Sequence, residues 1–290
     1  MVRIYMILHK QLKVLITILA VTILAVNQFD LVDSVSHEYT EMGMKRALLT
    51  FAAARALNGV ISVAQGTEVA LEPAGIGLTL TPGEILDPMN DLVERFSWVV
   101  LVSGTSLGIQ ELLLNISTWY WFKIIVTMTV LVSLLIMWIY RSEQDPMARF
   151  LVRISLVLLV TRFCVPFMAM TNEIIYRNFL EPRYTASSEE LRKISFDLDE
   201  LNQSSQETDT DSEVKNSLFE NARRLYRSAA ETVNIDARIS AFKQAAENIG
   251  EHTINLIVVF ITQTLLLPLL FLWLFLQLIK WIMRVDIKLE

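Results

Sequence analysis

The stretch that decides the fold is STWYWFKIIVTMTVLVSLLIMWIY, residues 117–140. It is an apolar run of membrane-spanning length, because about 20 residues cross the hydrocarbon core of a bilayer. Aromatic residues lie at both of its ends, from Trp119 at one to Trp138 at the other, as in the interfacial belts of spanning helices. Lys123 lies near one end, where its side chain can reach the polar interface. The stretch predicts a transmembrane helix.

Three further apolar segments predict membrane spans, at residues 13–28, 150–170 and 254–283. The first is short, and the basic residues before it resemble those of a signal peptide. No Ala-x-Ala cleavage site follows, however, so we expect an uncleaved anchor rather than a cleaved peptide. The last segment is longer than a bilayer core requires, so it should tilt or project from the membrane.

Basic residues orient these spans. They gather in three clusters: Arg3, Lys10 and Lys13; Arg141, Arg149 and Arg153; Lys280, Arg284 and Lys288. If both termini and the short turn after residue 140 are cytoplasmic, all three clusters lie inside, as the positive-inside rule requires. The two long connections, 30–116 and 171–253, are net acidic and then lie outside. We therefore expect a multi-pass protein of a cell (inner) membrane.

The connection 30–116 is ambiguous, because its apolar segments 47–64 and 97–116 could form two more spans and make six. The loop 65–96 between them is acidic, and its one basic residue is Arg95. Such a loop is a poor cytoplasmic loop. We therefore favour four spans, with this connection forming a hairpin of amphipathic helices that packs on or dips into the outer leaflet.

Local signals place the ends of that hairpin. Residues 81–84, Thr-Pro-Gly-Glu, predict a helix start, with a restart at Asp87 as the alternative, since Pro88 follows it. Segments 68–71 and 76–80 flank a Pro-Ala-Gly turn and suggest a small β-hairpin.

The connection 171–253 predicts an extracytoplasmic helical domain. We expect helices beginning near Ser187, near Ser212 and at Asn234, with a polar loop over 202–211. The third helix carries a heptad seam that continues into the last span and consists of Ile235, Ile239, Phe242, Ala246, Ile249, Thr253 and Leu256. A self-contained antiparallel three-helix bundle would use this seam internally. Alternatively, a second copy or another protein uses it as a coiled coil.

Arg162 is the most informative polar residue, because a charge within a membrane normally faces protein or water. Pro166 follows one turn later and should kink the helix, freeing backbone carbonyls. The last span offers Thr262 and Gln263, and then a second kink site at Pro268. We therefore treat Arg162, Gln263 and Thr262 as a hypothetical intramembrane polar site. The plainer alternative is that Arg162 reaches the outer interface or a backbone carbonyl and only fixes packing.

Gly104 and Gly108 form a GxxxG motif in an apolar segment, which predicts a close helix contact unless the pair arises by chance.

Composition excludes several classes of function. A net charge of -6 argues against nucleic-acid binding. The single cysteine, Cys164, and three scattered histidines give no metal site, and no motif of a nucleotide, cofactor or hydrolase site occurs. We therefore expect no enzyme, no catalytic residue, no metal and no cofactor.

The sequence thus predicts an all-α polytopic membrane protein in five parts. These are an anchor (1–29), the interfacial hairpin (30–116), a transmembrane hairpin (117–170), the extracytoplasmic helical domain (171–253) and a final span with a short cytoplasmic tail (254–290). Its partners should be the lipid bilayer and either a second copy or another membrane or extracytoplasmic protein. We expect an interaction or assembly protein. The alternative is a homo-oligomeric channel or transporter in which Arg162 contacts an anionic ligand.

Overall fold

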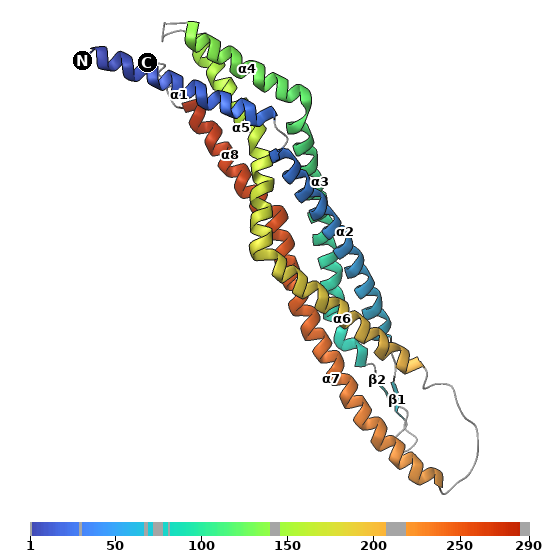
Figure 1. Cartoon of the computed structure of the whole chain (residues 1–290). Helices are drawn as coiled ribbons and strands as arrows, with labels where there is room; N and C mark the ends of the chain where they lie inside the picture. Colours follow the sequence, from blue (N-terminus) through green and yellow to red (C-terminus); the bar gives the residue numbers. More distant parts are fainter. Residues whose placement is uncertain are drawn as a thin grey trace. The chain divides into compact units, whose positions relative to one another are not determined.

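Helices account for nearly all of the chain described by the computed structural model, which covers residues 2–28, 31–66, 69–71, 78–80, 82–139, 146–206 and 219–284 (Figure 1). The helices before residue 140 are α1 (Val2–Gln28), α2 (Leu31–Gln65), the 3-10 turn η2 (Pro82–Leu86), α3 (Asp87–Thr118) and α4 (Tyr120–Ile139). Those after it are α5 (Pro146–Ile175), the π turn η3 (Tyr176–Leu180), α6 (Glu181–Gln206), α7 (Phe219–Ile261), the π turn η5 (Thr262–Leu266) and α8 (Leu267–Arg284).

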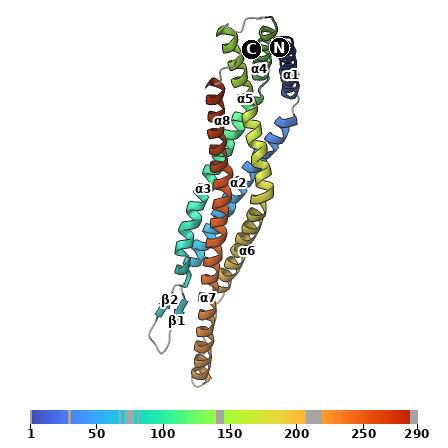
Figure 2. The same ribbon diagram turned by 90° about the vertical axis from the view of Figure 1, so that its left-hand side faces the viewer.

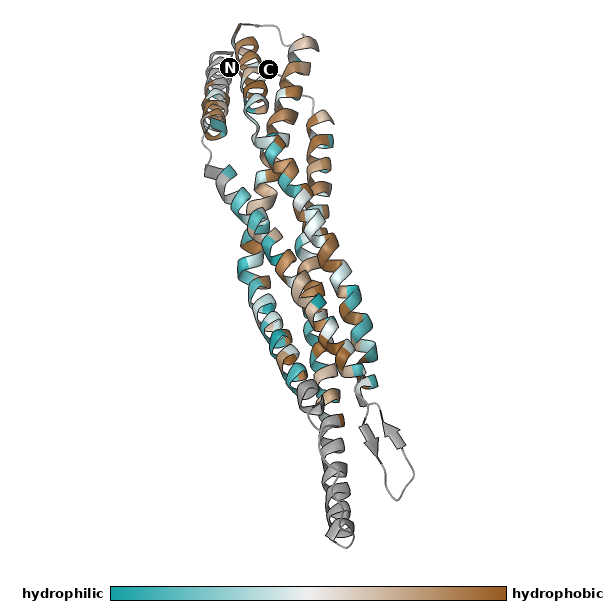
Figure 3. Ribbon diagram, turned by 90° about the vertical axis from the view of Figure 1, so that its right-hand side faces the viewer, coloured by the Kyte–Doolittle hydropathy of each residue, from teal (hydrophilic) through white to brown (hydrophobic). Residues whose placement is uncertain are grey.

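The predicted all-helical class is confirmed, and it includes helices that could span a membrane. Within the described residues, five helices are long and apolar enough to cross a membrane, and Figure 3 shows their hydrophobic residues in brown. They are Ser36–Gln65, Gly83–Thr118, Tyr120–Ile139, Arg149–Glu200 and Ile239–Arg284, with Val14–Gln28 as a shorter apolar helix. The predicted spans 150–170 and 254–283 fall within two of these helices, and the predicted span 117–140 overlaps a third, Tyr120–Ile139.

The short antiparallel pair β1 (Val69–Leu71) and β2 (Leu78–Leu80) lies in the two segments that suggest a hairpin, with Val69 opposite Leu80. The helix restart at Asp87 is also found, because η2 ends at Leu86 and α3 begins at the next residue.

The three helices predicted for 171–253 are wrong in number. No helix begins at Ser187, since α6 begins at Glu181 directly after η3, and Asn234 lies inside α7 rather than at a cap. Residues such as serine and asparagine favour helix caps but are also tolerated in helix interiors when tertiary contacts compensate. The described residues of this region therefore form two long helices, α6 and α7. The predicted helix start near Ser212 and residues 207–211 of the predicted loop lie outside the described residues.

The chain forms two compact units. Unit 1 comprises residues 1–45, 105–176 and 263–290, and unit 2 comprises 46–104 and 177–262. In unit 1, α1 packs on α4, α4 on α5, and α5 on α8. Its apolar centre is built around Leu24, Val126 and Val130. Val126 and Val130 lie one turn apart on α4, as expected where an amphipathic helix buries one face, and Leu24 packs with them from α1.

In unit 2, α6 and α7 lie side by side (Figures 1 and 2), and η2 packs on α7. The heptad seam of α7 is buried at Phe242, Ile249, Thr253 and Leu256. These four residues are therefore covered by the chain's own helices, as the internal use of the seam requires. Two ring contacts of Phe260, with Phe96 and Tyr184, complete this core, their centroids lying 6.4 and 6.2 Å apart respectively.

Glycines allow α2 and α3 to approach closely. A Cβ on Gly104 would lie 3.5 Å from the Ala47 Cβ, and a Cβ on Gly108 would lie 3.4 Å from the Met44 Cε. Gly43 makes a matching contact from α2, since its Cβ would lie 3.3 Å from the methyl groups of Leu107. Both glycines of the predicted contact motif thus lie where the two helices cross.

Gly83 offers a sharp test of the fold of unit 2. A Cβ at this position would lie 2.0 Å from the Ala64 carbonyl oxygen, so backbone would have to move. We expect Gly83→Ala to destabilise the protein by about 1–3 kcal/mol, as overpacking does. At Gly59 no atom lies within 4 Å of such a Cβ, so Gly59→Ala should stabilise the helix by up to about 1 kcal/mol. Thermal unfolding in detergent, followed by circular dichroism, measures both, and equal effects of the two variants would contradict this packing.

Candidate functional site

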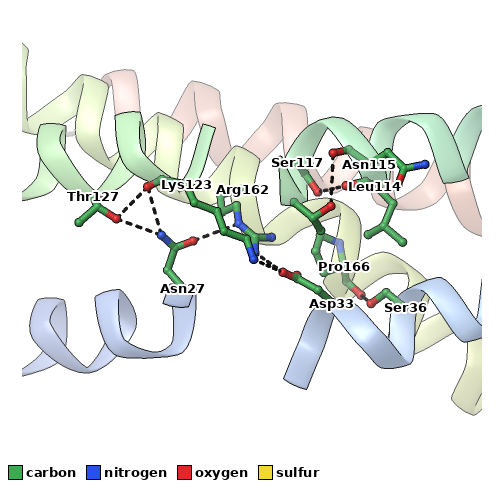
Figure 4. Close-up of polar contacts among 11 residues, drawn as sticks. Asn27, Asp33, Ser36, Leu114, Asn115, Ser117, Lys123, Thr127, Arg162 and Pro166 are labelled. Atoms are coloured by element: carbon green, nitrogen blue, oxygen red, sulfur yellow. Dashed lines mark hydrogen bonds and ion pairs between the residues drawn. The ribbon is translucent and has the colours of Figure 1, made fainter. Parts of the chain in front are cut away.

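A buried ion cluster lies in unit 1 (Figure 4). The carboxylate of Asp33, near the start of α2, accepts contacts from two cations at the same oxygen, Oδ2. Arg162 Nη2 from α5 lies 2.7 Å away and Lys123 Nζ from α4 lies 2.9 Å away. Arg162 Nε also donates to Asn27 Oδ1 at the end of α1, over 3.0 Å. We call Asn27, Asp33, Lys123 and Arg162 the Asp33 cluster.

The helix ends that supply these residues are themselves joined. Asn27 Nδ2 donates to Thr127 Oγ1 over 3.2 Å and to the Lys123 carbonyl oxygen over 3.4 Å (Figure 4). One amide side chain therefore connects the last turn of α1 with the first turns of α4 while its oxygen holds Arg162. The Asp33 cluster fixes three helices and the beginning of α2 around one carboxylate.

Next to the Asp33 cluster, a further bond joins α2 to α5 at Pro166. Proline has no N–H group, so Pro166 leaves the Arg162 carbonyl without its helical donor. Ser36 of α2 in turn donates its hydroxyl to the Pro166 carbonyl oxygen over 3.1 Å. Pro166 lies inside α5, which continues as a helix to Ile175, and at this position α2 is bonded to α5.

Burial makes the Asp33 cluster energetically demanding. Arg162 is 1% exposed, and the side chains of Asp33 and Lys123 are 7% and 12% exposed. Burial raises the pKa of the Asp33 carboxyl, but hydrogen bonds from Arg162 and Lys123 outweigh it and hold that pKa below its ordinary value. An ionised Asp33 then neutralises one of two buried cations. Removing the carboxylate would leave both cations without it in a medium of low dielectric constant.

The predicted Arg162–Gln263 contact has no counterpart among the described contacts, because the two side chains have different partners. Gln263 Nε2 donates to Tyr39 Oη over 2.8 Å. Thr262 begins the π turn η5, and Thr264 follows within it. Pro268 lacks the N–H group that an α-helix would direct at the Thr264 carbonyl. Ser106 supplies the missing donor over 2.8 Å.

A second polar group on α2 and α3 has no counterpart in the sequence predictions. His37 Nδ1 lies 2.8 Å from Glu111 Oε1, and Thr40 donates to the other carboxylate oxygen. Glu111 interrupts the apolar segment 97–116, and His37 and Thr40 lie one turn apart at the start of α2. That spacing is the signal from which the pair could have been inferred. These contacts are further bonds between α2 and α3 in unit 1.

No known protein family, no curated protein sequence and no solved structure matches the chain. Among the described residues, no three His, Cys, Asp or Glu side chains come together as ligands of a metal ion.

The Asp33 cluster predicts an order of stability among variants. Asp33→Asn leaves two buried cations without their carboxylate and should destabilise the protein by about 3–5 kcal/mol. Arg162→Met should destabilise it less, because Lys123 still pairs with Asp33. The double variant should be more stable than Asp33→Asn alone, since it removes one of the orphaned charges.

Thermal unfolding in detergent measures this order. The exposed pair of Glu41 and Lys45 is the matched control, and Glu41→Gln should leave the unfolding temperature unchanged. If Asp33→Asn and Glu41→Gln unfold at the same temperature, Asp33 is not a point on which the fold depends.

Proposed function

We propose that this chain is an integral membrane assembly protein, held in a cell membrane by four spans, whose extracytoplasmic helices bind another protein chain. The four spans are α1, α4, the first part of α5, and α8. Both termini are cytoplasmic, and the connections 30–116 and 171–253 are extracytoplasmic.

The geometry of unit 1 supports these spans. Trp138 Nε1 near the end of α4 donates to Thr17 Oγ1 in α1 over 3.1 Å, while Asn27 bonds to the first turns of α4. The two helices are therefore antiparallel, as consecutive crossings in opposite directions require. Large apolar side chains face outward from these helices, as lipid-facing residues do, among them Leu19, Leu135 and Trp273, each more than half exposed.

The connection between α3 and α4 supports four spans rather than six. The helix is interrupted at Trp119, and two backbone bonds meet at this residue, with Trp119 N donating to Ile116 O and Lys123 N donating to Trp119 O. Two consecutive spans need a reversal of the chain between them, and Figure 1 shows a bend rather than a reversal between α3 and α4. With α4 crossing the membrane, α3 continues on the outer side. We therefore propose that the α2–α3 hairpin begins at the outer leaflet and extends away from it.

The observation that carries the function is the apolar surface of unit 2. On α3, Trp98 and Val102 are 59% and 51% exposed, and on α2, Leu48 and Leu49 are 61% and 69% exposed. A groove of about 660 Å³ also lies between α2 and α6. Outside the membrane such surfaces would contact water, and contiguous exposed apolar surface on a soluble part typically marks a protein interaction site.

The channel hypothesis receives less support. A pore residue that selects anions must face a water-filled path. Arg162 is instead 1% exposed and bonded to Asp33 and Asn27. This environment suits the alternative in which Arg162 fixes packing.

Cysteine labelling tests the topology. In a Cys164→Ser background, Lys193→Cys places a single thiol on an exposed site of α6, and Arg284→Cys places one at the end of α8. A membrane-impermeant maleimide should label position 193 in intact cells and position 284 only after permeabilisation. Labelling of both positions, or of position 284 alone, in intact cells would overturn the proposed orientation.

Particle mass tests the assembly function. In lipid nanodiscs, mass photometry should find particles that contain more than one 33.1 kDa chain. Val102→Arg should return them to single chains, because a buried interface does not tolerate an unpaired charge. Lys243→Glu, on an exposed site of α7, should leave the mass unchanged. Wild-type protein that is monomeric in nanodiscs and has no companion chain in native membranes would contradict the function.

A further inference from the structure

The groove of about 660 Å³ within unit 2 has an apolar floor. The floor includes Ala53 and Ala56 of α2, which are exposed, and Leu256 of α7, which is buried. Leu49 and Phe196 also line the groove, and they are 69% and 65% exposed. We call this hollow the α2–α6 groove. Apolar groups left exposed side by side indicate a surface that another molecule covers.

Charged side chains of the groove argue against lipid as its occupant. Helix α6 contributes Glu189, Arg192 and Asp199 to the lining, and all three residues are exposed. A charged side chain is costly where it faces the hydrocarbon core of a membrane, so such residues face water or protein instead. An apolar floor that faces water is covered favourably by a protein. The occupant should therefore be a polypeptide segment with an apolar face.

The walls of the groove favour a helix over an extended segment. Both walls are helices, whose backbone N–H and C=O groups are bonded within each helix. An extended segment would find no backbone partners there, whereas an incoming helix bonds its own backbone. On α2 the lining runs from Leu49 to Val60, which is about 16 Å, or roughly three helical turns. An amphipathic helix of similar length fits this groove.

Charge selects among such helices. The sequence of unit 2 contains 13 lysines and arginines but 21 aspartates and glutamates, a net charge of -8, whereas the whole chain carries -6. The described residues that line the groove follow the same balance, with Glu189 and Asp199 against Arg192. Such a surface attracts a positively charged partner and repels a negatively charged one. The incoming helix should therefore carry basic residues beside its apolar stripe.

We propose that the α2–α6 groove binds a basic amphipathic helix of another protein. The apolar stripe of that helix covers the groove floor, and its basic residues lie beside Glu189 and Asp199. This inference rests on the proposed assembly function and names the chemistry of the chain that is bound. The exposed face of α3 that carries Val102 lies outside the groove lining and is a separate surface.

Photocrosslinking of the full chain in its own membrane tests the proposal. The photoreactive amino acid p-benzoylphenylalanine takes the place of Ala56 on the groove floor. Irradiation should give an adduct with a different protein. Mass spectrometry of the digested adduct should identify a segment with apolar residues at helical spacing and more basic than acidic residues. The same amino acid in place of Lys243, an exposed site of α7 that does not line the groove, should not give this adduct.

Charge reversal tests the position of the basic residues. Glu189→Lys combined with Asp199→Lys should reduce the adduct yield about tenfold, because attraction of the bound helix becomes repulsion. The matched control combines Asp197→Lys with Glu200→Lys, which changes the charge of α6 equally at sites outside the groove lining, and should keep most of the yield. All four residues are exposed, so both double variants should keep the wild-type unfolding temperature. Equal losses in the two double variants would overturn the contact with Glu189 and Asp199.

The outcomes separate this inference from the function on which it rests. An adduct at Ala56 with lipid, or with an acidic segment, overturns the basic helix as occupant. An adduct with a second copy of this chain overturns it as well and leaves the assembly function standing. Absence of any adduct has the same meaning when particles in nanodiscs contain more than one chain. Absence of any adduct, together with monomeric particles and no companion chain in native membranes, overturns both.

Discussion

The fold of unit 1 depends on one buried carboxylate. Asp33 lies 2.7 Å from Arg162 and 2.9 Å from Lys123, and the three residues come from three different helices. Two cations placed close together in an apolar bundle would repel each other and lose their hydration. The same helices therefore pack together because Asp33 is ionised and points between them. Asn27 adds an acceptor for Arg162 Nε, and Ser36 adds a hydroxyl bond to the Pro166 carbonyl oxygen one turn further along α5.

Long-range pairing of this kind separates what the sequence could predict from what it could not. The spans follow from composition and length, which are local properties, and the stretch around Trp119 to Trp138 was sufficient to identify the class. Arg162 stood out for the same local reason, as a charge in an apolar run. Its partner Asp33 lies 129 residues away in the chain. No acid occurs in the spans that pack beside Arg162, so a search restricted to spans could not find it.

The predicted helix boundaries in the region 171–253 are wrong for a different physical reason. Serine and asparagine favour helix caps, and this preference was the local evidence for placing helix starts at Ser187 and Asn234. A cap contributes about 1 kcal/mol, whereas burying a seam such as Phe242, Ile249 and Leu256 contributes more. One long uninterrupted helix keeps the seam residues on the same buried face. We therefore attribute the continuation of α7 through Asn234 to this burial. The π turns η3 and η5 also lack any signal in residue type, because they arise where packing requires one additional residue per turn.

The role of the exposed apolar side chains of unit 2 depends on which helices cross the membrane. Both α3 and α4 are apolar enough to cross a membrane, and a hydrophobic helix face needs no protein partner in lipid. On our proposal α4 crosses the bilayer and α3 continues outside it. Trp98 and Val102 of α3, which are 59% and 51% exposed, then need protein to cover them, because water would otherwise contact their apolar side chains. The assignment of the spans therefore decides whether the exposed side chains of α3 form a lipid-facing surface or a binding surface.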